Sequence, residues 1–353
     1  MAELESILEA YGIDPSRASI EIISSGLINP TWKVLTSEND FILQRINSTV
    51  FREPYKLAEN IRLLADYVSI NHPDYLFVAP TKAKDGNELV VFNGNHFRIF
   101  PFVKGSHTIQ SVETPEQAYE GAAQFGRFIT AFSGFAAQQL HPTIPDFHNL
   151  SFRYQQFRTS LIIGNKTRIQ SCAKEINELE SYAHLVRQYE SIRQNPSFKL
   201  RVTHHDTKIS NVLFDQNDKG ICVIDLDTVM PGYFISDVGD MMRTYLSPTN
   251  EEDADFSKIQ IRKDFFQATA QGYLENMGAE LSSVERQAFY YAGLFIVYMQ
   301  AIRFLTDYFN NDQYYGARYE THNLLRAQNQ FVLLSHLATQ QKSLQSSLPN
   351  FAR

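Results

Sequence analysis

The sequence contains very little cysteine, and this excludes two classes of site. Only Cys172 and Cys222 occur among 353 residues, and they lie far apart in the chain. One distant pair forms neither a disulfide framework nor the ligand set of a structural zinc site. We therefore expect both residues to be small, buried, apolar side chains.

The sequence also lacks an excess of positive charge. It carries 32 basic and 39 acidic side chains, a formal net charge of −7, and no block rich in lysine and arginine. Proteins that hold nucleic acids through their phosphates concentrate positive charge on one surface. We therefore expect no nucleic-acid partner.

No apolar run is long enough to span a bilayer. The longest one, "FYYAGLFIVYMQAI" at 289–302, is shorter than the roughly 20 residues that a spanning helix needs, and Arg303 follows it directly. The opening residues, "MAELESILEAYG", carry acidic side chains and lack the apolar region of a signal peptide. The expectation is a cytoplasmic monomer without a membrane partner.

What the chain does have is a β-rich beginning. The stretches 18–24, 31–37 and 40–46 are short β-branched or aromatic runs separated by turn residues, which predicts three strands. Apolar residues at helical spacing predict a helix over 53–69. The runs "NELVVFN" and "NHFRIFPFV" predict two more strands, with a turn at "NGN".

Beyond residue 103 helical periodicity dominates. Helices are predicted over 114–135, 175–194, 257–276, 282–309 and 321–341. A length of 353 residues suits roughly two domains of about 150 residues each. The sequence thus predicts an α+β, bilobal fold, with a small β-rich lobe at 1–102, a large helical lobe at 103–353, and a hinge at 100–105.

One polar loop stands between apolar flanks. The stretch "VTHHDTKISNVLFD" places His204, Asp206 and Asn211 in the pattern H-x-D-x-x-x-x-N, between two predicted short strands. Shortly afterwards "ICVIDLD" predicts another apolar strand that ends in Asp225 and Asp227. Folding alone does not call for these acids, because a buried carboxylate costs several kcal/mol unless a cation pairs with it.

Such a set of oxygen atoms suits a divalent cation. Mg²⁺ is held in proteins by one or two carboxylates together with substrate phosphates. A remaining carboxylate could then orient and deprotonate a hydroxyl nucleophile, as phosphoryl transfer requires. The alternative is a polar turn of purely structural function, with Asp206 capping the chain and Asn211 in a left-handed conformation.

The loop and the "VIDLD" strand together resemble the kinase-like phosphotransferase superfamily, which includes aminoglycoside phosphotransferases, choline kinases and homoserine kinases. Longer strings, "VIDLDTVMPGYFISDVGDMMR" and "RFLTDYFNNDQYYGARYETHNLLR" among them, resemble the N-acetylhexosamine 1-kinases. Those enzymes use ATP to phosphorylate the anomeric hydroxyl of N-acetylglucosamine and N-acetylgalactosamine. The resemblance covers about 24–330 and implies a protein-kinase-like fold that binds ATP, Mg²⁺ and a small sugar.

The resemblance also implies roles for individual residues. Asp206 corresponds to the catalytic base that faces the sugar hydroxyl, and Asn211 and Asp225 correspond to the magnesium ligands. Asp227 stands where relatives often have a second acid, which reaches a second metal or only braces the loop. The other implied contacts are to nucleotide (Gly26, Asn29, Thr31, Phe102 and Val103) and to sugar (Arg303 and Tyr314).

The chain departs from the family pattern at two places. Leu27 stands where those kinases have a histidine, and the strand that normally offers a lysine to the phosphates reads "FILQR". Gln44 and Arg45 lie near the lysine position, but neighbours on a strand point to opposite faces, so only one can face the cleft. The source of the positive charge is left open.

Several alternatives also stay open. Arg303 could instead form a structural ion pair with Asp307, four residues further on. His204 is expected to brace the loop through hydrogen bonds, and Asp237 and Asp240 are expected to support the loop or to cap a helix. As to activity, the same fold could serve an aminoglycoside, choline or homoserine, or could bind nucleotide without catalysis.

Overall fold

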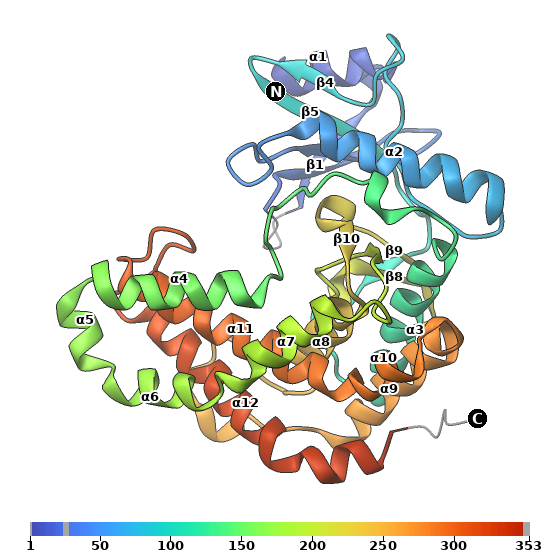
Figure 1. Ribbon diagram of the computed structural model, residues 1–353. Coiled ribbons are helices and arrows are strands. Elements are labelled where there is room, and N and C mark those ends of the chain that lie inside the picture. Colours follow the sequence, from blue (N-terminus) through green and yellow to red (C-terminus); the bar gives the residue numbers. More distant parts are fainter. Residues whose placement is uncertain (1, 24–27, 349–353) are drawn as a thin grey trace.

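The computed structural model describes residues 2–23 and 28–348, arranged as a small lobe above a larger helical lobe (Figure 1). The small lobe is built on one antiparallel sheet with the strand order β1-β2-β3-β5-β4. Its strands are β1 (Ser19–Ile23), β2 (Thr31–Leu35), β3 (Phe41–Arg45), β4 (Val90–Phe92) and β5 (Asn95–Pro101). All five predicted strands are confirmed.

The turn between β4 and β5 is fixed by its own residues. Asn93 and Gly94 adopt positive φ angles of 49° and 76°, as the two central residues of a type I′ hairpin turn do. One face of the sheet packs against α1 (Ala2–Ala10), where Ile7 and Leu8 are fully buried in a small apolar cluster. This cluster is separate from the larger core of the protein.

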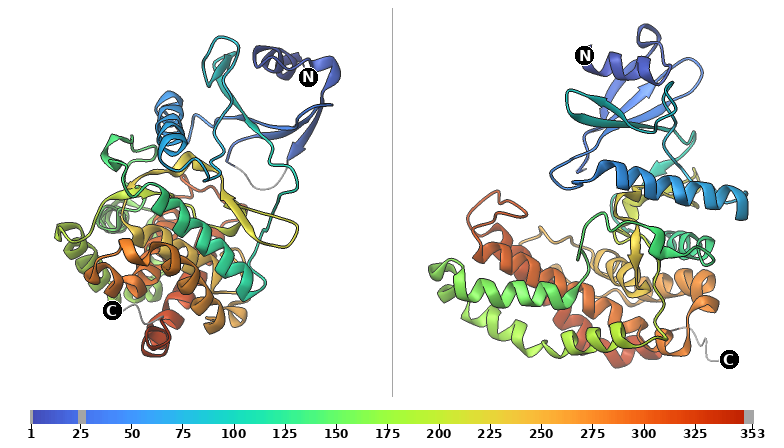
Figure 2. Two further views of the ribbon diagram at one scale, coloured as in Figure 1. Left: turned by 90° about the vertical axis from the view of Figure 1, so that its right-hand side faces the viewer. Right: turned by 45° about the horizontal axis from the view of Figure 1, so that its top comes forward.

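Helix α2 (Pro54–Asn71) belongs to the small lobe by sequence but not by packing. Its buried side chains, including Leu57, Ile61 and Leu64, are part of the large apolar core that continues through the helical lobe. Figure 2 shows the helix between the sheet and the elements below it. The sheet therefore ends close to residue 102, whereas the apolar core of the helical lobe extends across that boundary.

The helical lobe contains longer and shorter helices than the sequence predicts. The α-helices are α3 (Pro115–Ala131), α4 (Leu150–Ile163), α5 (Lys166–Ser171), α6 (Ala173–Ser181), α7 (His184–Gln194), α8 (Phe234–Tyr245), α9 (Lys263–Met277), α10 (Ser283–Gln287), α11 (Phe289–Phe309) and α12 (His322–Ser346). Short 3₁₀ turns occur in both lobes: η1 (Pro15–Arg17) belongs to the small lobe, and the helical lobe contains η2 (Ala137–Gln139), η3 (Ile209–Asn211), η4 (Leu226–Thr228), η5 (Phe256–Lys258) and η6 (Gly278–Glu280).

The predicted helices are present, with changes at their ends. The start of α3 is as expected, because Thr114 caps it by accepting a hydrogen bond from the Gln117 N–H. The predicted helix at 175–194 is divided between α6 and α7, and that at 282–309 is interrupted at Ala288. Helices α4, α5 and α8 have no counterpart among the predictions.

Helix α11 is the core of this lobe. By length and composition it could cross a membrane, yet 89% of its apolar window is buried inside the protein, as in a core helix. It packs against α4, α8 and α12. Cys172 and Cys222 are likewise buried and free, as predicted.

The polar loop is held between short strands that face the small lobe. β7 (Arg201–Thr203) pairs with β10 (Met230–Gly232), while β8 (Val212–Phe214) pairs with β6 (His107–Thr108) and with β9 (Gly220–Val223). In the β8–β9 hairpin Val212 lies opposite Val223, and the Ile224 N–H donates to the Asn211 carbonyl at 2.9 Å. Asn211 and Asp225 therefore leave the hairpin at the same end.

Candidate active site

The conformation of the polar loop is imposed by two buried carboxylates of α8. Asp237 accepts hydrogen bonds from the backbone N–H groups of His204 and His205, at 3.0 and 2.8 Å. Asp240 accepts from the N–H of Thr207 at 2.8 Å. The expectation that both acids support the loop is confirmed.

His204 braces the loop as a neutral side chain. Its Nε2 hydrogen-bonds the Ile224 carbonyl at 3.0 Å, and its Nδ1 accepts from the Asp206 N–H at 3.3 Å. Burial lowers the pKa of His204 to about 4, so the ring is uncharged near neutral pH. The predicted bracing role is confirmed.

Asp206 is an ionised carboxylate with two donors on one oxygen. Its Oδ2 lies 2.9 Å from Lys208 Nζ and 3.0 Å from Asn211 Nδ2. Burial, the largest single influence, raises the pKa of Asp206, but Lys208, His204 and the Asn211 amide together outweigh burial and hold the pKa below its usual value. The group can therefore accept a hydrogen bond from an incoming hydroxyl.

Lys208 was missed at the sequence level as a site residue. It lies near both Asp206 and Asp225; desolvation opposes its charged form, but these carboxylates raise its pKa. A cation at this position can neutralise charge that develops on a transferred phosphoryl group. The signal was its place two residues after Asp206 within the polar loop.

Asp225 carries the feature that best fits a divalent cation. It lies directly before η4 in a left-handed conformation, with φ and ψ both 60°. Burial, followed by the charges of Asp227 and Asp206, raises the pKa of Asp225 to about 7. Such crowding of negative charge is relieved by a bound cation.

The amide of Asn211 is oriented to complete such a site. Its Nδ2 donates to the Asp206 backbone carbonyl and carboxylate, and no described residue hydrogen-bonds its Oδ1. Within 2–23 and 28–348, no group of three or more acidic, histidine or cysteine side chains could hold a metal ion. The Asn211 amide oxygen and the Asp225 carboxylate are oxygen ligands of the kind that Mg²⁺ takes together with phosphate and water oxygens.

Asp227 is engaged by the small lobe instead. Its Oδ1 lies 2.6 Å from Arg98 Nη2, and its Oδ2 accepts from Asn29 Nδ2 at 2.7 Å. The Arg98 and Asp227 side chains are only 1% and 2% exposed. Of the two roles that the sequence left open for Asp227, this arrangement fits bracing, here between the two lobes.

The positively charged side chain that lies next to Asp227 comes from β5 rather than from β3. Gln44 lies opposite Arg98 in the sheet, and its Oε1 accepts from both Nε and Nη2 of Arg98 at 3.1 and 2.8 Å. Arg45 points to the other face of the strand. Arg98 was missed at the sequence level, although it is a single charged residue within the apolar run "NHFRIFPFV".

The residues that the resemblance assigns to nucleotide contact are distributed as follows. Gly26 lies outside the described residues. Thr31 donates to the Asn29 carbonyl at 2.9 Å, so these two residues fix the chain just before β2. The Phe102 N–H donates a hydrogen bond to the Asp40 carbonyl, and the Val103 carbonyl accepts one from Ser106. The Phe102 carbonyl and the Val103 N–H have no hydrogen bond within the described chain, so both could form hydrogen bonds with the base of a nucleotide.

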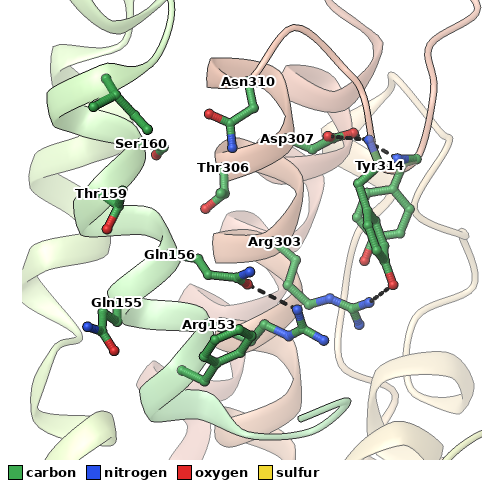
Figure 3. A pocket seen from close by; sticks show the side chains of 13 residues that line it. Arg153, Gln155, Gln156, Thr159, Ser160, Arg303, Thr306, Asp307, Asn310 and Tyr314 are labelled. Atoms are coloured by element: carbon green, nitrogen blue, oxygen red, sulfur yellow. Dashed lines mark hydrogen bonds between the residues drawn. The ribbon is translucent and has the colours of Figure 1, made fainter. Parts of the chain in front are cut away.

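A cavity of about 490 Å³ lies between α4, α11 and the segment after α11 (Figure 3). Arg303 and Tyr314 both line it, and Arg303 Nη2 approaches the Tyr314 hydroxyl at 3.4 Å. The alternative ion pair with Asp307 is not formed: that carboxylate accepts from the N–H groups of Tyr314 and Tyr315. The remaining lining residues are Phe152, Arg153, Gln155, Gln156, Thr159, Ser160, Ile163, Thr306, Asn310 and Tyr315.

The cavity adjoins the polar loop through Phe147. The Arg303 guanidinium carbon lies 5.2 Å from the centre of the Phe147 ring. That ring centre is in turn 6.5 Å from the ring of His205, the residue before Asp206. Phe147 therefore lies between the wall of the cavity and the polar loop.

Comparison with known proteins matches this architecture to one family. The phosphotransferase enzyme family matches residues 19–275. Among solved structures, the microcompartment-associated aminopropanol kinase is similar, with a TM-score of 0.66, 16% identity and coverage of 98% of both chains. A spectinomycin phosphotransferase, solved with ADP and spectinomycin, has a TM-score of 0.60 and 14% identity over 96% of this chain and 98% of its own. Choline kinase from Cryptosporidium parvum has a TM-score of 0.58 and 15% identity over 98% and 97%.

Proposed function

The chain belongs to the phosphotransferase enzyme family, and we propose that it transfers the γ-phosphoryl group of ATP to the anomeric hydroxyl of an N-acetylhexosamine. The bilobal fold and the polar loop support an ATP-dependent kinase with an alcohol acceptor. The choice of a sugar as acceptor is supported by the motif strings around Asp225 and Arg303 and by the chemistry of the cavity.

The observation that carries the choice of acceptor is the charge of the cavity. Its lining includes Arg153 and Arg303, whereas its one carboxylate, Asp307, is already bound to backbone N–H groups. A cationic acceptor such as choline or an aminoglycoside needs aromatic or acidic surroundings that stabilise positive charge. Phe152, Tyr314 and Tyr315 also line this cavity, but the positive charges of Arg153 and Arg303 oppose the entry of a cationic acceptor.

The other lining groups suit a neutral sugar. Side-chain amides from Gln155, Gln156 and Asn310 and hydroxyls from Thr159 and Thr306 offer both donors and acceptors. Sugar hydroxyls and an acetamide group present the same mixture. A volume of about 490 Å³ lies within the usual range of small-molecule sites.

In the proposed reaction the protein mostly positions groups and neutralises charge. Mg²⁺, held by Asn211 and Asp225, would neutralise charge on the nucleotide phosphates. Asp206 would accept a hydrogen bond from the sugar hydroxyl, orient it for in-line attack and take its proton. Lys208, which contacts the Asp206 carboxylate, would stabilise charge on the transferred group.

The proposal is tested by an acceptor panel with coupled detection of ADP. The purified full-length chain is given Mg²⁺, ATP and, in turn, N-acetylglucosamine, N-acetylgalactosamine, choline, homoserine and an aminoglycoside. We expect turnover with the N-acetylhexosamines only. Phosphorylation at the anomeric position also removes the reducing end, so a reducing-sugar assay should fall in step with ADP release.

Two controls make the result specific. The 1-deoxy analogue of N-acetylglucosamine lacks the anomeric hydroxyl and should give no ADP above background. Asp206→Asn should bind nucleotide without turnover. Faster turnover of choline or an aminoglycoside, or phosphorylation of the 1-deoxy sugar, would refute the proposal. A wild-type chain without any magnesium-dependent turnover would favour a non-catalytic nucleotide-binding role.

A further inference from the structure

Two arginines lie side by side in the acceptor cavity. Arg153 projects from α4 and Arg303 from α11 into the cavity, and their guanidinium groups lie near each other in Figure 3. The residues are only 8% and 9% exposed. Both charges are thus largely removed from bulk water.

Neither arginine is paired with a carboxylate within the described residues. Arg153 donates to Gln156 Oε1 at 3.0 Å and to the Phe147 carbonyl at 3.4 Å, and its Nε has no hydrogen-bond partner there. Arg303 donates to Gln300 Oε1 at 3.1 Å and approaches Tyr314. All of these partners are neutral.

The other buried arginines show that this arrangement is unusual for this protein. Arg98 forms an ion pair with Asp227, and Arg201 forms one with Glu285. Leaving a buried charge without a counter-charge is strongly unfavourable, and placing two like charges together adds repulsion. The described residues surround the arginine pair with amides and aromatic rings rather than carboxylates, so an anion supplied by a ligand would stabilise both charges.

The acids around the cavity cannot meet this need. Asp307 is engaged by the backbone of Tyr314 and Tyr315. Asp146 is exposed and hydrogen-bonded to Asn149. Burial first, and the charge of Arg303 second, lowers the pKa of Arg153 to about 10, which reflects the missing counter-charge.

We infer that Arg153 and Arg303 together bind an acidic substituent, a carboxylate or a phosphate, carried by the sugar acceptor. This inference rests on the proposed function, because it treats the cavity as the acceptor site. A free inorganic anion would fill only a small part of about 490 Å³, and the surrounding amides and hydroxyls suit a sugar ring. Paired guanidinium groups suit an oxyanion because each can donate two parallel hydrogen bonds.

The test compares neutral and acidic versions of one sugar. N-acetylglucosamine is set against its C6-carboxylate, its 6-phosphate and its 3-O-carboxymethyl ether, with kcat/KM measured for the wild-type chain. We expect at least one acidic derivative to exceed the neutral parent by roughly tenfold or more, the size expected for hydrogen bonds to a charged group. In Arg153→Gln the ratio of acidic to neutral kcat/KM should fall toward one.

Arg158→Gln is the matched control. Arg158 lies on the same helix, but its side chain is 58% exposed and pairs with Glu180. This variant should keep the wild-type ratio. If the ratio of acidic to neutral kcat/KM fell toward one in both variants, the effect would be a general one of charge on α4, and the assignment to Arg153 would be overturned.

Direct binding separates failure of this inference from failure of the proposed function. Calorimetry is carried out on the wild-type chain with a non-hydrolysable ATP analogue and Mg²⁺, using each sugar and also inorganic phosphate. Tighter binding of an acidic sugar, lost in Arg153→Gln, supports the inference whether or not turnover occurs. Equal affinities for neutral and acidic sugars, or binding of inorganic phosphate alone, would overturn it even if N-acetylglucosamine is phosphorylated.

Discussion

The buried contact between Arg98 and Asp227 should couple stability to nucleotide binding. Arg98→Met leaves the Asp227 carboxylate, 2% exposed, with Asn29 as its remaining side-chain donor. Removing one partner of a buried ion pair costs about 3–5 kcal/mol. At about 2–4 °C per kcal/mol for a chain of this general size, the midpoint of thermal unfolding should fall by roughly 10 °C.

The measurement is a double-mutant cycle in urea. Arg98→Met, Asp227→Asn and the double variant are unfolded, and the free energy of unfolding is compared with that of the wild-type chain. Because the double variant no longer buries an unpaired charge, it should recover about 2 kcal/mol or more relative to the sum of the single changes. The affinity for the Mg²⁺–ATP complex should also fall in Arg98→Met, since the contact joins the small lobe to the loop that carries Asp225.

The control is another buried ion pair, between Arg201 and Glu285, which lies within the helical lobe. Arg201→Met should lose a similar free energy of unfolding while the folded fraction keeps its nucleotide affinity. A coupling energy below about 0.5 kcal/mol between Arg98 and Asp227 would refute the argument, because that is the range found for independent sites.

Three further outcomes follow from the site. Asp206→Asn should lower kcat by about 10²–10⁴, the range for loss of a general base, while the KM for ATP changes little; near-normal turnover in steady-state assays would remove Asp206 from the mechanism. The pKa of Asp225 is about 7, and only its ionised form can hold Mg²⁺, so the rate should fall as the pH drops below 7. A higher Mg²⁺ concentration should move this acidic limb of the pH–rate profile to lower pH. An acidic limb that does not shift with the Mg²⁺ concentration would argue against Asp225 as a metal ligand. Gly239→Ala should destabilise the fold by about 1–3 kcal/mol, read as a lower unfolding midpoint, because the new methyl group would collide with the Ala292 carbonyl on α11.

Local patterns in the sequence determined the layout of the chain. Alternating apolar residues and turn residues specified all five strands of the small lobe, since period-two alternation and an Asn-Gly turn act over a few residues. The capping residue Thr114 marked the start of α3 for the same reason. The polar loop and the "VIDLD" strand identified Asp206, Asn211 and Asp225, because short spacing along one hairpin keeps them together.

Helix α4 shows where local pattern stops being informative. It was not predicted, because its buried residues, Leu150, Arg153, Phe157 and Ser160, mix polar with apolar side chains. Its position is set by packing against α11, which lies far away in sequence. The division of 175–194 into two helices has no comparable local signal.

Only the tertiary structure decided which charges meet. Arg98 reaches Asp227 because the register of β3 with β5 places it opposite Gln44 and the two lobes close over it. Arg153 and Arg303 lie near each other because α4 and α11 pack together, and neither forms an ion pair with a carboxylate of the described chain. Sequence spacing gives no account of such encounters, because Coulomb energy depends on distance and burial in the folded chain rather than on order along it.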